Sequence, residues 1–168
     1  LCCATDAGRK RKIVMNKRRL GRTSLYVTEI GLGTNAVGGH NLYEDLSEDD
    51  GVALVRRATE LGVNFIDTAD VYGLGRSEEL IGEALQDFSG EVFIATKGGS
   101  EFDPVTKKRI GVNNRPAYLR RALENSLRRL RRETVDLYYL HRLDGETPVC
   151  EAFGELMRFK DAGKIRAA

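Results

Sequence analysis

The stretch Glu91-Val92-Phe93-Ile94-Ala95-Thr96-Lys97 is a short apolar run that ends in a charged residue. Two similar runs occur at residues 63–67 and 134–141. All three are close to continuously apolar rather than alternating, and such strands are typical of sheets that are covered on both faces. The pattern therefore predicts buried strands of a parallel sheet.

Segments with apolar residues at helical spacing separate these runs. Ser47 is followed by three acidic residues and the pattern stops at Gly62, which predicts a helix capped by Ser47. We expect further helices to begin at Ser77 and Pro116 and to span residues 149–162. Residues 19–27 predict a β-hairpin, and 28–34 and 164–168 predict short strands. Alternating strands and helices indicate an α/β fold.

The loops lack the nucleotide-binding motifs that are typical of open α/β sheets. Residues 31–36 contain only two of the three glycines of a dinucleotide-binding fingerprint and do not lead straight into a helix, and no phosphate-binding P-loop motif is present. An eight-fold (β/α)8 TIM barrel is the better alternative. Such barrels need about 250 residues, so the 168 residues here are expected to hold about half of one.

Composition excludes several classes of protein. No apolar run approaches the roughly 20 residues of a membrane-spanning helix, and no secretory signal is visible. Cys2, Cys3 and Cys150 cannot all pair with one another and lack metal-ligand spacing. We therefore expect a cytoplasmic protein with no membrane contact, no disulfide framework and no metal site.

The charge is unevenly distributed along the chain. Residues 1–19 carry a net charge of +6, whereas the remainder carries −4, so the body does not have the charge of a nucleic-acid-binding domain. Residues 1–14 show no periodicity and are hypothesised to be extra or disordered sequence. We expect a basic tail over 1–18 and one domain over 19–168. The arginine pairs within 120–132 are expected to form a solvated helix face.

Reactive side chains stand where the predicted strands end. The second, third and fourth strands end at Asp67, Lys97 and His141, and Tyr72 follows five residues after Asp67. In α/β barrels the chemistry lies at this carboxyl-terminal rim. Each residue alone has an ordinary explanation, such as an ion pair for Asp67 or loop packing for Tyr72. Their occurrence together on one rim is the main functional signal.

These four residue types fit a single reaction. A free phenol has a pKa of about 10, and a nearby ammonium group such as Lys97 favours the phenolate. Asp67 is expected to orient Lys97, and His141 to donate a hydrogen bond to a substrate carbonyl oxygen. The set predicts a general-acid site, with Tyr72 as the donor, that protonates an oxygen while a hydride reaches the adjacent carbon.

The motifs that carry these residues resemble the aldo-keto reductase family. They are the segment 67–73 (Asp-Thr-Ala-Asp-Val-Tyr-Gly), the segments 95–97 and 137–141, and the flanking segments 30–34 and 162–166. The resemblance implies a TIM barrel with an N-terminal hairpin at its base, which reduces aldehydes or ketones with NADPH. It implies a catalytic tetrad of Asp67, Tyr72, Lys97 and His141, and places Thr34, Asn35 and Asp67 at the nicotinamide. Residues 33–43 are similar to a bacterial reductase of inositol operons.

The chain also departs from this family, because family members are about twice as long. The resemblance therefore implies only the N-terminal half of a barrel, with sheet edges that the missing C-terminal half or self-association would cover. We expect little or no activity from the isolated chain toward a small carbonyl substrate. Three alternatives stay open: a non-catalytic cofactor-sensing subunit, an inert truncated product, and a barrel enzyme that forms a Schiff base on Lys97.

Overall fold

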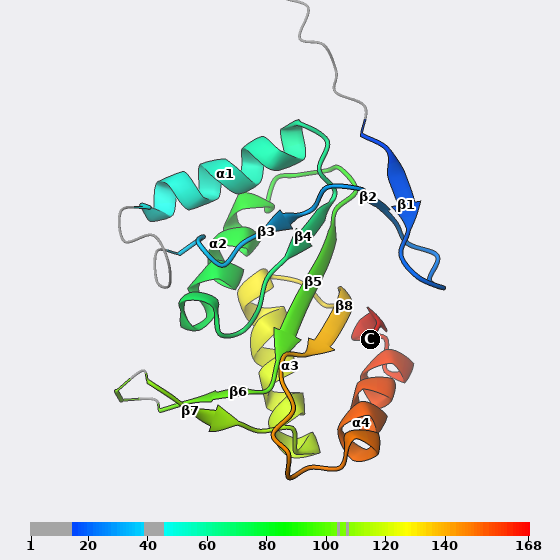
Figure 1. Ribbon diagram of the computed structural model, residues 1–168. Coiled ribbons are helices and arrows are strands. Elements are labelled where there is room, and N and C mark those ends of the chain that lie inside the picture. The colour runs from blue at the N-terminus through cyan, green and yellow to red at the C-terminus, as the bar shows by residue number, and fades with distance from the viewer. Residues whose placement is uncertain (1–14, 39–45, 104, 107) are drawn as a thin grey trace, which may run out of the picture.

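A five-stranded parallel sheet forms the centre of the computed structural model, which describes residues 15–38, 46–103, 105–106 and 108–168. Its order follows the chain (Figure 1). The strands are β3 (Leu32–Gly33), β4 (Phe65–Asp67), β5 (Phe93–Gly98), β8 (Val135–Leu140) and β9 (Ile165–Ala167). The predicted α/β fold with a parallel sheet is confirmed. Within the described residues the sheet is open, with β3 and β9 at its edges.

Four helices connect successive strands of this sheet: α1 (Glu48–Glu60), α2 (Arg76–Ala84), α3 (Pro116–Leu130) and α4 (Val149–Asp161). Ser47 caps α1 as predicted, since its side chain accepts a hydrogen bond from the Asp50 N–H. The predicted capping role of Ser77 is wrong. α2 begins one residue earlier after Gly75, and the Ser77 hydroxyl instead donates to the Thr34 carbonyl oxygen at 3.0 Å.

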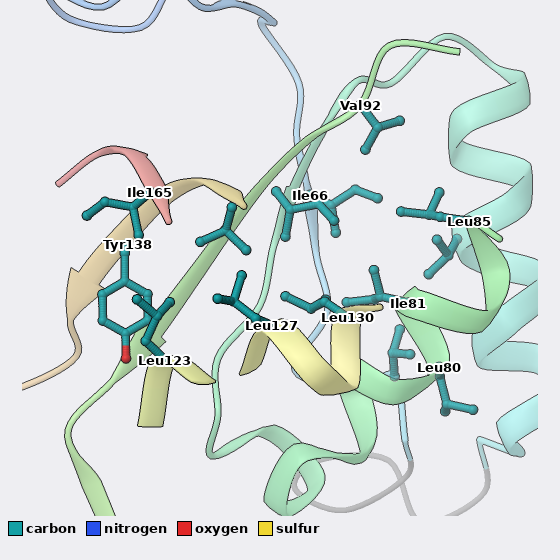
Figure 2. Close-up of a cluster of buried hydrophobic side chains, with 14 of the residues drawn as sticks. Ile66, Leu80, Ile81, Leu85, Val92, Leu123, Leu127, Leu130, Tyr138 and Ile165 are labelled. Carbon is teal, nitrogen blue, oxygen red and sulfur yellow. The ribbon is translucent and has the colours of Figure 1, made fainter. Parts of the chain in front are cut away.

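The main hydrophobic core lies between the helices and one face of the sheet. Ile66, Ile94 and Tyr138 point from β4, β5 and β8 into this core, and all three are almost fully buried. Figure 2 shows side chains from α2 and α3 meeting those of the strands in one cluster. Burial of this apolar surface is the main favourable contribution to folding.

A β-hairpin packs against the opposite face of the sheet. It consists of β1 (Lys17–Arg19) and β2 (Tyr26–Thr28), and its Leu25 and Val27 form a second cluster with Phe93. Asn64 fixes the hairpin, because its Oδ1 accepts the Thr28 N–H at 2.7 Å and its Nδ2 donates to the Tyr26 carbonyl at 3.1 Å. The hairpin thus lies at the amino-terminal ends of β4 and β5.

Two residues of the segment predicted as a tail, 1–18, lie in a strand. Lys17 and Arg18 belong to β1, where they pair with Thr28 and Val27, and the Lys17 amine also lies 2.8 Å from a carboxylate oxygen of Glu91. The hypothesis about residues 1–14 concerns residues outside the described part of the chain. No helix in the described part is both long and apolar enough to span a membrane.

Two further elements were not predicted. A short 3-10 turn, η1 (Tyr72–Gly75), follows β4, and an antiparallel hairpin of β6 (Ser100–Phe102) and β7 (Arg109–Val112) follows β5. This second hairpin projects away from the sheet (Figure 1). Its strands are short, and Ser100 is the one buried residue among their seven, so they lack the apolar periodicity that indicates the strands of the main sheet.

The arginine-rich face of α3 is only partly solvated. Arg121 and Arg128 are exposed, as expected, but Arg129 is half-buried and contacts the fully buried Glu78 of α2 at 2.7 Å. Arg120 pairs with the buried Glu155 of α4 at 2.5 Å. Two of these arginines therefore neutralise buried carboxylates, which a helical-face pattern alone does not reveal.

Candidate active site

The register of β4 and β5 places Asp67 and Lys97 on the same face of the sheet. Asp67 lies opposite Ala95, and Lys97 follows two residues later on the same side. The pairing continues past the end of β4, because the Asp70 N–H donates to the Lys97 carbonyl at 3.0 Å. This is the face opposite the helices, so the two charged side chains avoid the main core.

The Lys97 amine is the centre of the cluster. It lies 2.7 Å from Oδ2 of Asp67, 2.8 Å from the Thr68 carbonyl oxygen and 3.4 Å from the Tyr72 hydroxyl. An ammonium group has three donors, and all three are directed to oxygen atoms here. The Lys97 side chain is 15% exposed, and that of Asp67 is 35% exposed. The Lys97 amine is thus held in place, while part of the Asp67 side chain stays accessible to solvent.

Tyr72 reaches the amine because the chain after β4 turns sharply. Gly73, Leu74 and Gly75 have φ angles of 58°, 57° and 98°, so three consecutive residues are left-handed. Leu74 is a rare non-glycine residue in this region, and such strain is often found near functional sites. A Cβ on Gly75 would stand 2.7 Å from the Arg129 side chain, so this turn packs directly against α3.

His141 lies beside the phenol. The centroid of its ring is 5.9 Å from that of Tyr72, in an edge-on arrangement at 87°. The backbone N–H of His141 donates to the Gly98 carbonyl at 2.9 Å. Burial first and the positive charge of Lys97 second lower the pKa of His141 below its ordinary value. The imidazole is therefore neutral at neutral pH and carries one N–H donor. Its Nδ1 is buried and has no hydrogen-bond partner among the described residues.

The other predicted cofactor residues differ in exposure. Thr34 is fully buried, and its hydroxyl donates to the Asp67 carbonyl at 2.9 Å, so it supports the backbone of Asp67. Asn35 is half-buried at the neighbouring position. The roles of Thr34, Asn35 and Asp67 toward a nicotinamide stay predictions. No group of three or more metal-ligating side chains is arranged for an ion within the described ranges.

A layer of buried polar residues behind the turn was missed. Glu78 is fully buried, and its carboxylate accepts hydrogen bonds from the Thr96 hydroxyl at 2.5 Å and from Arg129 at 2.7 Å. Asp70 lies next to this pair. Glu78 stands in the first turn of α2, where an acidic residue is common. The one signal of its burial is that it lies one helical turn before the apolar Ile81.

Comparisons with known proteins concern the family and the fold of this chain. The model of the Aldo/keto reductase family matches residues 29–168. The chain is 40% identical over 151 residues to an aldo-keto reductase of Schizosaccharomyces pombe named with NADP(+), covering 89% of this chain and 43% of that protein. Among solved structures, the holo form of a Bacillus halodurans aldo-keto reductase has a TM-score of 0.82 and 33% identity, over 91% of this chain and 49% of the other.

A glycerol dehydrogenase of Gluconobacter oxydans is also similar, with a TM-score of 0.80 and 38% identity over 90% of this chain and 47% of the other. The chain thus spans about half the length of the relatives that it matches.

The narrower similarity of residues 33–43 to an inositol-operon reductase stays a prediction, since residues 39–43 lie outside the described part. The family match, the sheet and the cluster around Lys97 lead to one conclusion: this chain belongs to the aldo/keto reductase family.

Proposed function

We propose that this chain provides the proton-donating half of a site that reduces aldehydes or ketones with NADPH. The observation that carries the proposal is the position of the Lys97 amine, 2.7 Å from Asp67 and 3.4 Å from the Tyr72 hydroxyl. The relative from S. pombe is named as an NADP(+) enzyme, which supports the choice of cofactor. Tyr72 is the proposed proton donor.

The reaction requires a proton on the carbonyl oxygen as negative charge develops there. The Tyr72 hydroxyl donates that proton, and the Lys97 ammonium stabilises the phenolate that is left behind. Asp67 and the Thr68 carbonyl hold Lys97 in place. The neutral His141, beside the Tyr72 ring, donates a hydrogen bond to the same oxygen and so orients the substrate. NADPH supplies the hydride when it is bound.

The residues present fit one end of a dinucleotide site. Asp67 keeps part of its side chain exposed, and Asn35 is half-buried just after the neighbouring strand β3, so polar groups are accessible at these two strand ends. The chain spans about half the length of its relatives, and we propose that polypeptide outside it completes the cofactor site. On this basis the isolated chain has little or no turnover.

The alternative of a Schiff base on Lys97 lacks support. Its amine is directed to three oxygen atoms and is only slightly exposed, so it is not free to attack a carbonyl carbon. Borohydride in the presence of an aldehyde should therefore leave Lys97 unmodified. Mass spectrometry of the treated chain checks this.

A chimera tests the proposed function. Residues 29–168 replace the corresponding segment of the B. halodurans reductase, and NADPH oxidation with a reactive aromatic aldehyde is followed by absorbance. We expect turnover in the chimera, and a loss of about 100-fold or more in its Tyr72→Phe variant. Tyr139→Phe is a stringent control, because the Tyr139 phenol lies opposite Lys97 in the register of β5 and β8 and is partly exposed, but it makes no hydrogen bond with Lys97. A folded chimera that turns over equally well with Tyr72→Phe contradicts the proposal.

A further inference from the structure

Ser77, at the start of α2, is the centre of a buried hydroxyl network behind the proposed site. Its side chain is fully buried, as are those of Thr34 and Thr68. The Ser77 hydroxyl donates to the Thr34 carbonyl oxygen at 3.0 Å. Its Oγ also lies 3.1 Å from Oγ1 of Thr34 and 3.2 Å from Oγ1 of Thr68. The network therefore ties the first turn of α2 to the residues that follow β3 and β4.

The hydrogen bonds of this network run in one direction. Each hydroxyl has a single hydrogen to donate. Thr34 donates its hydrogen to the Asp67 carbonyl at 2.9 Å, and Ser77 donates its own toward Thr34. The Thr68 hydroxyl is then the donor in its contact with the Ser77 Oγ. The chain of hydrogen bonds thus runs from Thr68 through Ser77 to Thr34, and ends on Asp67.

The two residues at the ends of this chain are the ones that hold the Lys97 amine. The amine lies 2.7 Å from Oδ2 of Asp67 and 2.8 Å from the Thr68 carbonyl oxygen. The Asp67 carbonyl accepts two hydrogen bonds from Thr34, one from its hydroxyl and one from its backbone N–H at 3.0 Å. Two of the three oxygen partners of the amine therefore belong to a segment that Ser77 and Thr34 fix from behind.

Ser77 is also connected to the turn that carries Tyr72. α2 begins directly after η1, so Ser77 follows Tyr72 by five residues. The packing around it is close, because a Cβ on Gly38 would stand 3.2 Å from the Ser77 backbone nitrogen. The same serine is thus linked to the phenol by a short stretch of chain and to the partners of the amine by hydrogen bonds.

We propose that Ser77 is a positioning residue that fixes the end of β4 and thereby keeps the Lys97 amine within reach of the Tyr72 hydroxyl. It acts through Asp67 and Thr68, since its own hydroxyl bonds to Thr34 and Thr68. Small displacements of a catalytic group are costly in rate. The effect of Ser77 on catalysis rests on the proposed function, whereas its effect on the Lys97 amine does not.

The first test measures the protection of the Lys97 amine in the 168-residue chain. Acetylation by an N-hydroxysuccinimide ester requires a free amine, and mass spectrometry gives its rate at Lys97 relative to the exposed Lys160. Ser77→Ala removes the link between Thr68 and Thr34. We expect Lys97 to be acetylated about 5-fold faster in this variant, which is the change in local opening that the loss of one buried hydrogen bond produces.

Two further variants separate positioning from stability. Ser126→Ala is the matched control, because Ser126 is a fully buried serine whose Oγ bonds within α3, and it should leave the Lys97 rate unchanged. Combining Ser77→Ala with Thr68→Val removes the hydroxyl that has lost its acceptor, so stability in urea should recover toward wild type. Lys97 should stay as reactive as in Ser77→Ala, because the link to the loop after β3 is still absent. This double variant carries the test if Ser77→Ala does not fold.

The second test measures turnover in the chimera with the B. halodurans reductase. Ser77→Ala should lower kcat about 10-fold, because the amine no longer lies where it stabilises the phenolate. The KM for the aldehyde should change by less than about 3-fold, since the substrate does not bind to this network. Ser126→Ala should leave both constants unchanged. A rise in KM with an unchanged kcat contradicts the proposal.

Three results of the acetylation experiment overturn the proposal. The first is a wild-type rate at Lys97 in folded Ser77→Ala. The second is an equal rise in Ser126→Ala, which would make the effect one of general stability. The third is recovery of both stability and Lys97 protection in the double variant, because packing alone would then suffice. Acetylation needs no turnover, so if the unsubstituted chimera is inactive the proposed function fails, while the rate at Lys97 still decides the role of Ser77.

Discussion

The hydroxyl oxygen of Tyr138 lies 2.0 Å from the point where a Cβ on Gly98 would stand. Tyr138 is fully buried between β8 and the helices, and Gly98 is the last residue of β5. Any side chain at position 98 therefore displaces a large buried ring next to the strand end that carries Lys97. The close approach explains why this strand ends in glycine.

The first prediction concerns this contact. Gly98→Ala should lower the free energy of unfolding by about 1–3 kcal/mol, because overpacking displaces Tyr138. Urea denaturation measures this. Gly154→Ala is the control, since no other described atom lies within 4 Å of its added Cβ, and alanine favours a helix by roughly 0.5–1 kcal/mol. Adding Tyr138→Phe to Gly98→Ala should recover part of the loss. Equal stability of both alanine variants would contradict the steric explanation.

The second prediction concerns the buried pair of Glu78 and Arg129. Arg129→Met leaves a fully buried carboxylate without its cation, so we expect a loss of about 3–5 kcal/mol in chemical denaturation. Arg128→Met, on the exposed neighbouring position, should change stability little. Combining Arg129→Met with Glu78→Gln should restore part of the loss, because the buried charge is then absent. No recovery in the double variant would argue that packing, not charge, dominates.

The third prediction gives the stability cost of Asp70. Burial and then the charge of Glu78 raise its pKa from 3.8 to about 7 on folding, so between these values the native state binds more protons than the unfolded state. The free energy of unfolding contributed by this group therefore falls as pH rises from about 4 to 7. We therefore compare the free energies of unfolding of Asp70→Asn and wild type at two pH values. The difference between them should shift in favour of the variant by roughly 1–3 kcal/mol from pH 5 to pH 8. A pH-independent difference between the two proteins would refute this.

The fourth prediction concerns His141. Burial and then Lys97 lower its pKa, so Lys97→Met should raise the His141 pKa toward its ordinary value without reaching it. As pH falls, His141 is protonated at a higher pH in the unfolded state than in the folded state. The stability that the neutral imidazole contributes is therefore lost as pH falls through about 6.5. NMR titration of the imidazole measures the shift. Lys160→Met is the control, because Lys160 is an exposed cation on α4, and this variant should leave the His141 titration unchanged. A shift of the His141 pKa in Lys160→Met as large as that in Lys97→Met would exclude a local effect of the Lys97 charge.

The main elements of the fold were predictable from the sequence because their signals are strong and local. The apolar runs gave β4, β5 and β8, and Ser47 and Pro116 marked the starts of α1 and α3. The start of α2 was misplaced by one residue because Ser77 has a typical cap identity but its hydroxyl serves the loop after β3. The hairpin of β6 and β7 was missed because it has no apolar face.

The candidate site was predictable only in part. Asp67, Lys97 and His141 were found because parallel strands end at one rim, and the structure brings Tyr72 to within 3.4 Å of the Lys97 amine. Asp70 was quoted within a motif but given no role. Its raised pKa depends on burial and on charges from α2 and α3, so no local pattern reveals it.

The two faces of the sheet have different consequences for how this protein can change over evolution. Ile66 and Ile94 face the helices and maintain the fold, whereas their immediate neighbours Asp67 and Ala95 face the other way. Because successive residues of a strand alternate between faces, a substitution at an exposed position on the side of Asp67 need not disturb the core that faces the helices. Variants confined to those exposed positions should therefore fold, whereas substitutions at the buried Ala95, Leu137 or Ala167 of the same face should destabilise the sheet.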